Sequence, residues 1–132
     1  MVKVLIVDDH ELYREGLKDL LSGNPDIMVT GEASNGQEAL SMIAENDYRV
    51  VLLDITMPGI DGIEVLEKLK DSESKVKVLM LSIQSEEHYL VRAFKAGASG
   101  YLTKNRAPRE LISAIKTVSS GGKYLSPNRD RK

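Results

Sequence analysis

The sequence contains no cysteine, and no part of it is apolar for long. The lack of cysteine excludes disulfides, thiolate metal sites and thiol nucleophiles, and it fits a reducing compartment. No run approaches the ~20 apolar residues that a membrane-spanning helix needs. The apolar start, Met1–Val7, is too short for a secretory signal peptide and meets acidic residues immediately. We therefore expect a cytoplasmic protein without a membrane segment.

An excess of charge of one sign is also missing. Lysine and arginine number 18 against 20 aspartates and glutamates, which gives a net charge of -2 and no general attraction to nucleic acid or anionic lipid. The phosphate-binding motifs G-x-x-x-x-G-K-[ST] and G-x-G-x-x-G are absent, which disfavours a nucleotide- or flavin-binding module. The 132 residues, 42% of them hydrophobic and 29% charged, suit one soluble globular domain.

Short apolar runs alternate with segments that have a helical spacing of apolar residues. The runs rich in valine and leucine are typical of strands buried on both faces. Strand and helix alternate five times with short connections, which predicts a parallel sheet with helices on both faces. The predicted strands are Lys3–Val7, Ile27–Ala33, Val50–Asp54, Val76–Ser82 and Gly100–Lys104.

Polar side chains stand where several of these strands end. Asp8 and Asp9 follow the first strand, Asp54 ends the third, Ser82 the fourth and Lys104 the fifth. The carboxyl ends of parallel strands share one edge, where ligands bind in open α/β sheets. Two carboxylates about 4 Å apart repel by about 4 kcal/mol at an effective dielectric constant of about 20. One lysine cannot offset three such acids, and oxygen ligands favour Mg²⁺ or Mn²⁺.

This edge suits phosphoryl chemistry on Asp54. Carboxylates form aspartyl-phosphates, and a divalent cation can hold the phosphoryl group against the nucleophile. Lys104 would pair with the added charge, and Ser82 could donate to a phosphoryl oxygen. Each residue alone also has an ordinary structural explanation, such as a helix cap for Asp8 and Asp9. The hypothesis depends on their convergence.

The same residues carry a resemblance to a known family. Residues 2–122 resemble the receiver domain of a two-component response regulator. The segments that match are Leu5–His10, Leu52–Gly62, Leu81–Ser82 and Gly97–Lys104. The tracts Asp8–Leu17 and Gly121–Pro127 resemble the NarL/FixJ-like subfamily, whose receiver precedes a LuxR-type helix-turn-helix domain.

The resemblance implies a role for each site residue. Asp54 would accept a phosphoryl group from a sensor histidine kinase, and Ser82 and Lys104 would bind that group. Asp8, Asp9, Asp54 and the backbone carbonyl of Thr56 would hold Mg²⁺ or Mn²⁺.

Three further positions match residues that modulate such a domain. Tyr101 would be the aromatic residue that changes rotamer when Ser82 moves toward the phosphate. Thr56 and Gln84 would tune how fast water removes the phosphate. His10 is assigned to the start of the first helix rather than to metal binding.

The predicted fold is therefore a flavodoxin-like, doubly wound five-stranded parallel sheet of order 2-1-3-4-5. Residues 1–122 would form the receiver, and 123–132 a linker or tail, with the output domain absent from this chain. We expect a signalling switch rather than an enzyme. The only chemistry of this switch would be self-phosphotransfer and autodephosphorylation. It would control transcription through the helix-turn-helix domain of a longer parent, without binding nucleic acid itself.

Some points stay open at the sequence level. Many receivers have proline after the lysine, with a cis bond, whereas this chain has Lys104-Asn105. Similar receivers form homodimers through their first and last helices. In this chain, the sequence of these helices does not distinguish a dimer surface from ordinary surface. An aspartate-nucleophile phosphohydrolase would need an acid two residues after Asp54, where Thr56 stands. A pseudo-receiver that acts without phosphate would lack part of the acidic set.

Overall fold

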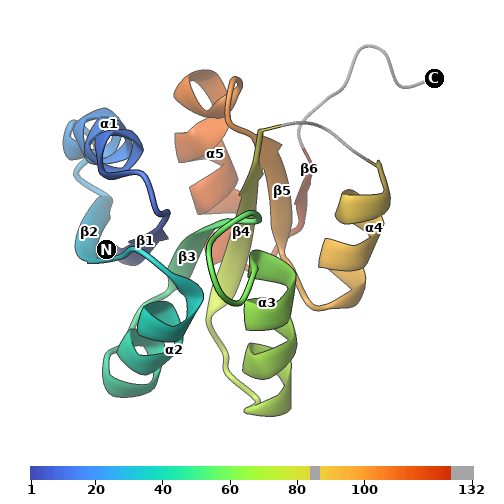
Figure 1. Ribbon diagram of the computed structural model, residues 1–132. Coiled ribbons are helices and arrows are strands. Elements are labelled where there is room, and N and C mark those ends of the chain that lie inside the picture. The colour runs from blue at the N-terminus through green and yellow to red at the C-terminus, as the bar shows by residue number, and fades with distance from the viewer. Residues whose placement is uncertain (84–86, 126–132) are drawn as a thin grey trace.

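A computed structural model of the chain describes residues 1–83 and 87–125 (Figure 1). Strands and helices alternate along it, as the spacing of apolar residues predicts. The elements are β1 (Val2–Val7), α1 (Glu11–Ser22), β2 (Ile27–Ala33), α2 (Gly36–Glu45), β3 (Val50–Asp54), α3 (Gly62–Asp71), β4 (Lys77–Ser82), α4 (Glu87–Lys95), β5 (Gly100–Thr103), α5 (Ala107–Ser119) and β6 (Tyr124–Leu125). Within the described ranges, no helix is long and apolar enough to cross a membrane.

The sheet is parallel throughout, with the order β2-β1-β3-β4-β5-β6. The predicted fold class and the order of the first five strands are confirmed, and the sheet has one strand more than predicted. Tyr124 and Leu125, predicted as part of a tail, pair with Gly100 and Tyr101 of β5. A strand of two residues is too short to give a recognisable apolar run in the sequence. It is identified only by its pairing with the edge of β5.

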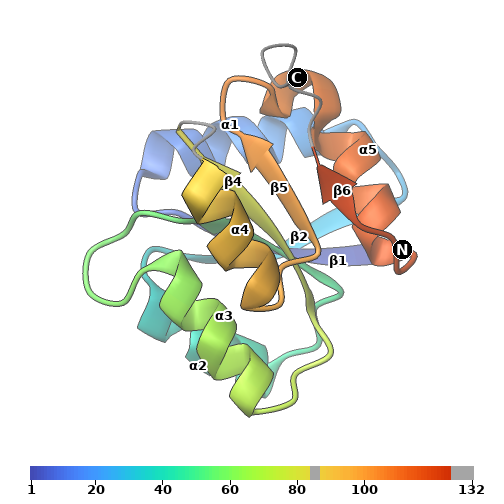
Figure 2. The same cartoon turned by 90° about the vertical axis from the view of Figure 1, so that its right-hand side faces the viewer.

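Two apolar clusters, one on each face of the sheet, explain the unbroken apolar runs. Alternate residues of β1 serve both: Leu5 and Val7 belong to the cluster under α2, α3 and α4, and Val4 and Ile6 to the cluster under α1 and α5. The two views show the helices divided in this way (Figures 1 and 2). With both faces covered, the polar residues of the central strands can reach solvent only at the strand ends.

The loop between β3 and α3 is folded tightly against the end of β3. The Gly62 amide donates to the Ile55 carbonyl at 2.8 Å, and Asp61 caps α3 by accepting the Glu64 amide at 2.9 Å. A Cβ atom on Gly62 would stand 2.7 Å from the Asp54 carbonyl oxygen and 2.9 Å from the Ile55 Cα. These are backbone atoms, so they cannot move aside without shifting the strand end that carries the Asp54 side chain.

Gly62→Ala should therefore lower the free energy of unfolding by about 1–3 kcal/mol, because the extra methyl group overpacks this contact. Gly16→Ala is the matched control: Gly16 lies inside α1, and its Cβ would meet nothing within 4 Å. There alanine should stabilise the helix by about 0.5–1 kcal/mol. Urea unfolding of both variants measures the difference. Equal stability of the two variants would contradict the tight packing described for Gly62.

Candidate functional site

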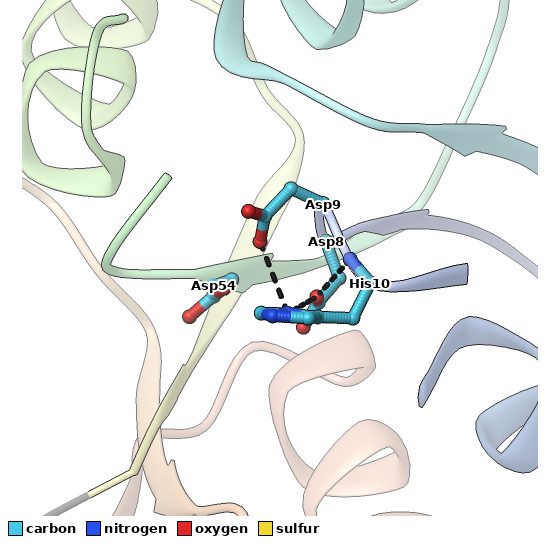
Figure 3. A group of neighbouring side chains, drawn as sticks. All are labelled: Asp8, Asp9, His10 and Asp54. Atoms are coloured by element: carbon cyan, nitrogen blue, oxygen red, sulfur yellow. Dashed lines mark hydrogen bonds and ion pairs between the residues drawn. The ribbon is translucent and has the colours of Figure 1, made fainter. Parts of the chain in front are cut away.

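The acidic residues predicted to converge lie together at the carboxyl edge of the sheet. Asp8 follows β1 and Asp54 ends β3, and both are buried, with 1% and 3% of their surfaces exposed. Asp9 lies beside them, and its side chain is 27% exposed. Figure 3 shows the four side chains gathered at the strand ends, with the His10 ring joined to Asp8 and to Asp9; one ligand atom from each of the four residues lies within 4.8 Å of the others.

Lys104 joins the acidic cluster from the end of β5. Its Nζ donates to Oδ2 of Asp8 at 2.7 Å and stands 3.5 Å from Oδ2 of Asp54. The ammonium also lies over the Tyr13 ring, 4.3 Å from its centroid, within the range of a cation–π contact. Its charge is thus shared between two carboxylates and an aromatic face.

The other predicted site residues lie on the neighbouring strands and loop. Ser82 is buried at the end of β4, and its carbonyl accepts the Lys104 amide at 2.7 Å. The Thr56 amide donates to Oδ1 of Asp54 at 3.3 Å, while the residue itself is exposed. Tyr101, on β5, is 2% exposed and belongs to the cluster under α2, α3 and α4.

Gln84 lies outside the described residues. The peptide bond between Lys104 and Asn105, whose geometry the sequence left open, is trans. Lys104 therefore reaches the carboxylates without a cis bond.

Three residues at the start of α1 touch the site without having been predicted to. His10 does open α1, but its amide also donates to Oδ1 of Asp8 at 2.8 Å, and its Nδ1 lies 3.2 Å from Asp8 and from Asp9. Arg14 donates from Nη1 to the Asp8 carbonyl at 2.6 Å. Residues spaced by about one helical turn share a face. Tyr13 and Arg14 follow His10 by three and four residues, and this spacing is the signal that could have found them once His10 is known to contact the site.

Burial and mutual repulsion shape the acid–base properties of the site. Burial, followed by the nearby Asp8 carboxylate, raises the pKa of Asp54 from 3.8 to about 6, although Lys104 and the Thr56 amide oppose the shift. Burial, with help from Asp8 and Asp54, also raises the pKa of the Tyr13 hydroxyl to about 12. Burial is the larger cause of both shifts, and repulsion from the neighbouring carboxylates adds to it.

The donor set suits a divalent cation. Several carboxylate oxygens within reach of one another are the ligands that Mg²⁺ and Mn²⁺ prefer, and a dication would relieve the repulsion that raises the Asp54 pKa. The acidic cluster is therefore compatible with divalent metal binding.

Comparisons with known proteins agree with this geometry. The family described as the response regulator receiver domain matches residues 4–116. The chain is 44% identical over 126 residues to the response regulator UvrY of Escherichia coli (strain K12), a match that covers 96% of this chain and 58% of UvrY. It is 39% identical over 123 residues to the nitrate/nitrite response regulator protein NarL of the same strain, covering 93% of this chain and 57% of NarL. The chain thus spans less than two thirds of these relatives.

Solved structures give the same result. A two-component response regulator of the LuxR family from Aurantimonas sp. SI85-9A1 superposes with a TM-score of 0.92 at 33% identity, covering 96% of this chain and 91% of that one. The signal receiver domain of the putative response regulator NarL from Mycobacterium tuberculosis superposes with a TM-score of 0.87 at 36% identity, covering 91% and 97%. The predicted resemblance is confirmed: the chain belongs to the response regulator receiver domain family, and its relatives are response regulators of the UvrY and NarL type.

Proposed function

We propose that the chain is a phosphorylation-driven switch in which Asp54 accepts a phosphoryl group from a sensor histidine kinase. The observation that carries the proposal is the position of Asp54 at the strand end, with Lys104 at 3.5 Å and Asp8 and Asp9 beside it. Membership of the receiver family supports the same reaction.

In the proposed transfer, an ionised oxygen of Asp54 attacks the phosphorus of a phosphohistidine on the kinase. The new P–O bond forms as the P–N bond breaks, and the electron pair leaves with the histidine nitrogen. Asp8, Asp9, Asp54 and the Thr56 carbonyl would hold Mg²⁺ or Mn²⁺, which supplies positive charge for the phosphoryl oxygens. Lys104 adds its ammonium, and the Ser82 hydroxyl donates to a phosphoryl oxygen.

In the proposed phosphoryl transfer, Lys104 must exchange its contact with Asp8 for one with the phosphoryl group on Asp54. Its shortest contact is with Asp8, at 2.7 Å, and Asp54 is 0.8 Å further away (3.5 minus 2.7). A phosphoryl group on Asp54 brings more negative charge than the carboxylate it replaces, so the ammonium is drawn toward it. Phosphorylation therefore rearranges an ion pair that already exists.

The switch itself would run through β4 and β5. Ser82 pairs with Thr103, and Met80 pairs with Tyr101, so the hydroxyl and the aromatic ring lie on adjacent strands. We propose that Ser82 moves toward the phosphate and Tyr101 changes rotamer, which alters the surface of α4 and β5. A coupling of about 1–3 kcal/mol is enough to change partner affinity. Thr56 and Gln84 would tune how fast water removes the phosphate.

The full signalling role needs a longer parent protein. We propose that residues 1–122 are the receiver and that residues 123–132, which include β6, are the linker. In the parent, a helix-turn-helix domain would follow and regulate transcription. The chain acts in the cytoplasm as a phosphoacceptor rather than an enzyme, with self-phosphotransfer and autodephosphorylation as its only chemistry. Homodimerisation through α1 and α5 belongs to the same proposal.

Acetyl phosphate with Mg²⁺ should add one phosphoryl group to the chain, and Asp54→Asn should abolish it because the amide is not a nucleophile. Asp61→Asn is the matched control, since Asp61 follows the same strand but caps α3. Mass spectrometry of the intact protein, with and without chelator, gives the readout. Equal phosphorylation of Asp54→Asn and the unchanged chain would refute the assignment.

The same carboxylate should make stability depend on pH when chelator is present. The folded pKa of Asp54, about 6, lies above its ordinary 3.8, so the folded state binds more protons between these values and stability falls as pH rises through them. Asp54→Asn should therefore raise the free energy of unfolding by about 1–3 kcal/mol at pH 7–8 and by little near pH 4. Urea unfolding across this pH range measures the gain. An Asn variant less stable than the unchanged chain at pH 8 would contradict the repulsion described above.

A further inference from the structure

Arg14 ties α1 to the turn that carries the acid pair. Its Nη1 donates to the backbone carbonyl of Asp8 at 2.6 Å, and its Nε donates to Oε1 of Glu32 at 3.1 Å. The Arg14 side chain is only 15% exposed, whereas that of Glu32 is 33% exposed, so the guanidinium is mostly buried and its carboxylate partner reaches water. One guanidinium thus bridges the end of β1 and the end of β2.

The carbonyl that Arg14 holds controls the next residue. It belongs to the peptide plane between Asp8 and Asp9, and rotation of this plane changes the direction in which the Asp9 side chain leaves the backbone. The other groups of Asp8 are held as well: its amide donates to Ala33 at 3.1 Å, and its carboxylate accepts from Lys104 at 2.7 Å and from the His10 amide at 2.8 Å.

The Asp9 side chain has fewer contacts than that of Asp8. Its carboxylate contacts the His10 ring at 3.2 Å, and that ring is itself 68% exposed. The orientation of Asp9 therefore depends on the backbone before it more than on contacts of its own side chain.

Glu32 holds the guanidinium in place. Its Oε1 accepts from Arg14, while its Oε2 accepts from Lys18 at 2.7 Å. Lys18, with help from Arg14 and against the effect of burial, keeps the pKa of Glu32 below its ordinary value, so Glu32 is a carboxylate. Arginine donates from separate nitrogens of a rigid planar fork, so it fixes the carbonyl and the carboxylate relative to each other, whereas a lysine is a compact charge on a flexible stem.

We propose that Arg14 is a positioning residue for the divalent cation: by holding the Asp8 carbonyl, it sets the direction of Asp9 toward Asp54. This inference rests on the proposed function, which makes Asp9 a metal ligand. It gives α1 and β2, which supply no ligand, a part in metal affinity. Groups that orient metal ligands are commonly worth about 10- to 100-fold in affinity.

The test compares two variants that both lose a contact to Glu32. Arg14→Met removes the donors and keeps the packed stem, and it should weaken Mg²⁺ binding about tenfold in isothermal titration calorimetry. Lys18→Met loses a contact to the same Glu32 carboxylate but leaves the contact between Arg14 and the Asp8 carbonyl in place. It should therefore leave Mg²⁺ affinity unchanged. Loss of a positive charge should by itself strengthen Mg²⁺ binding. Equal affinity losses in the two variants would overturn the proposal, because they would indicate an effect of the lost contact to Glu32 rather than of the Asp8 carbonyl.

A readout without metal separates positioning from stability. In chelator, hydrogen exchange at the His10 amide, which donates to Oδ1 of Asp8, should speed up in Arg14→Met and not in Lys18→Met. Thermal unfolding reports the stability of each variant. A lower unfolding temperature of Arg14→Met with unchanged Mg²⁺ affinity would mean that Arg14 only fastens α1 to the sheet, which overturns the proposal.

Glu32→Gln provides a second variant in case Arg14→Met does not fold. It keeps the guanidinium but loosens its orientation, so Mg²⁺ binding should weaken by less than in Arg14→Met, and no weakening would count against the proposal. Failure of the unchanged chain to bind Mg²⁺ is a distinct result: it contradicts the proposed function, and the role of Arg14 falls with it.

Discussion

The carboxyl edge of the sheet carries an imbalance of charge that the rest of the structure has to offset. Asp8 and Asp54 are almost completely buried, Asp9 lies beside them, and Lys104 supplies one ammonium to this cluster. Burying like charges together is costly, and the raised pKa of Asp54 reflects that cost. The fold accepts it because two apolar clusters, one on each face of the sheet, stabilise the strands that end there.

This imbalance gives the site two ways to respond to a ligand. A divalent cation would neutralise the carboxylates, and a phosphoryl group on Asp54 would draw Lys104 away from Asp8. The Lys104–Asp8 pair is buried, so removing one partner leaves an uncompensated charge unless a cation takes its place. In the proposed function, metal binding and phosphorylation would therefore be coupled through one lysine, which also contacts the Tyr13 ring on α1.

Much of this arrangement could be predicted from the sequence, for physical reasons. A strand buried on both faces needs an unbroken apolar run, so runs such as Val50–Leu53 identify central strands, and the polar residue that ends each run must lie at the rim. Parallel pairing then brings Asp8, Asp9, Asp54 and Lys104 to the same edge. Their convergence follows from topology and needs no knowledge of loop conformation.

The features that could not be predicted depend on tertiary contacts. β6 has two residues and exists because the edge of β5 is available to Tyr124, whose hydroxyl also contacts Glu110 on α5. The contacts of His10, Tyr13 and Arg14 require the phase of α1 relative to the end of β1, which apolar spacing alone does not give. The sequence places Lys104 beside the three acids, but it does not indicate that the lysine lies closer to Asp8 than to Asp54.

The most direct test of the charge imbalance is a crystal structure grown with Mn²⁺, located by its anomalous scattering. The account predicts one strong peak at coordination distance, about 2.0–2.3 Å, from carboxylate oxygens of both Asp9 and Asp54. Lys104 should remain within hydrogen-bonding distance of Asp8, since no phosphoryl group is present to draw it away. An edge without such a peak at saturating Mn²⁺, or Asp9 and Asp54 turned away from each other, would contradict the account.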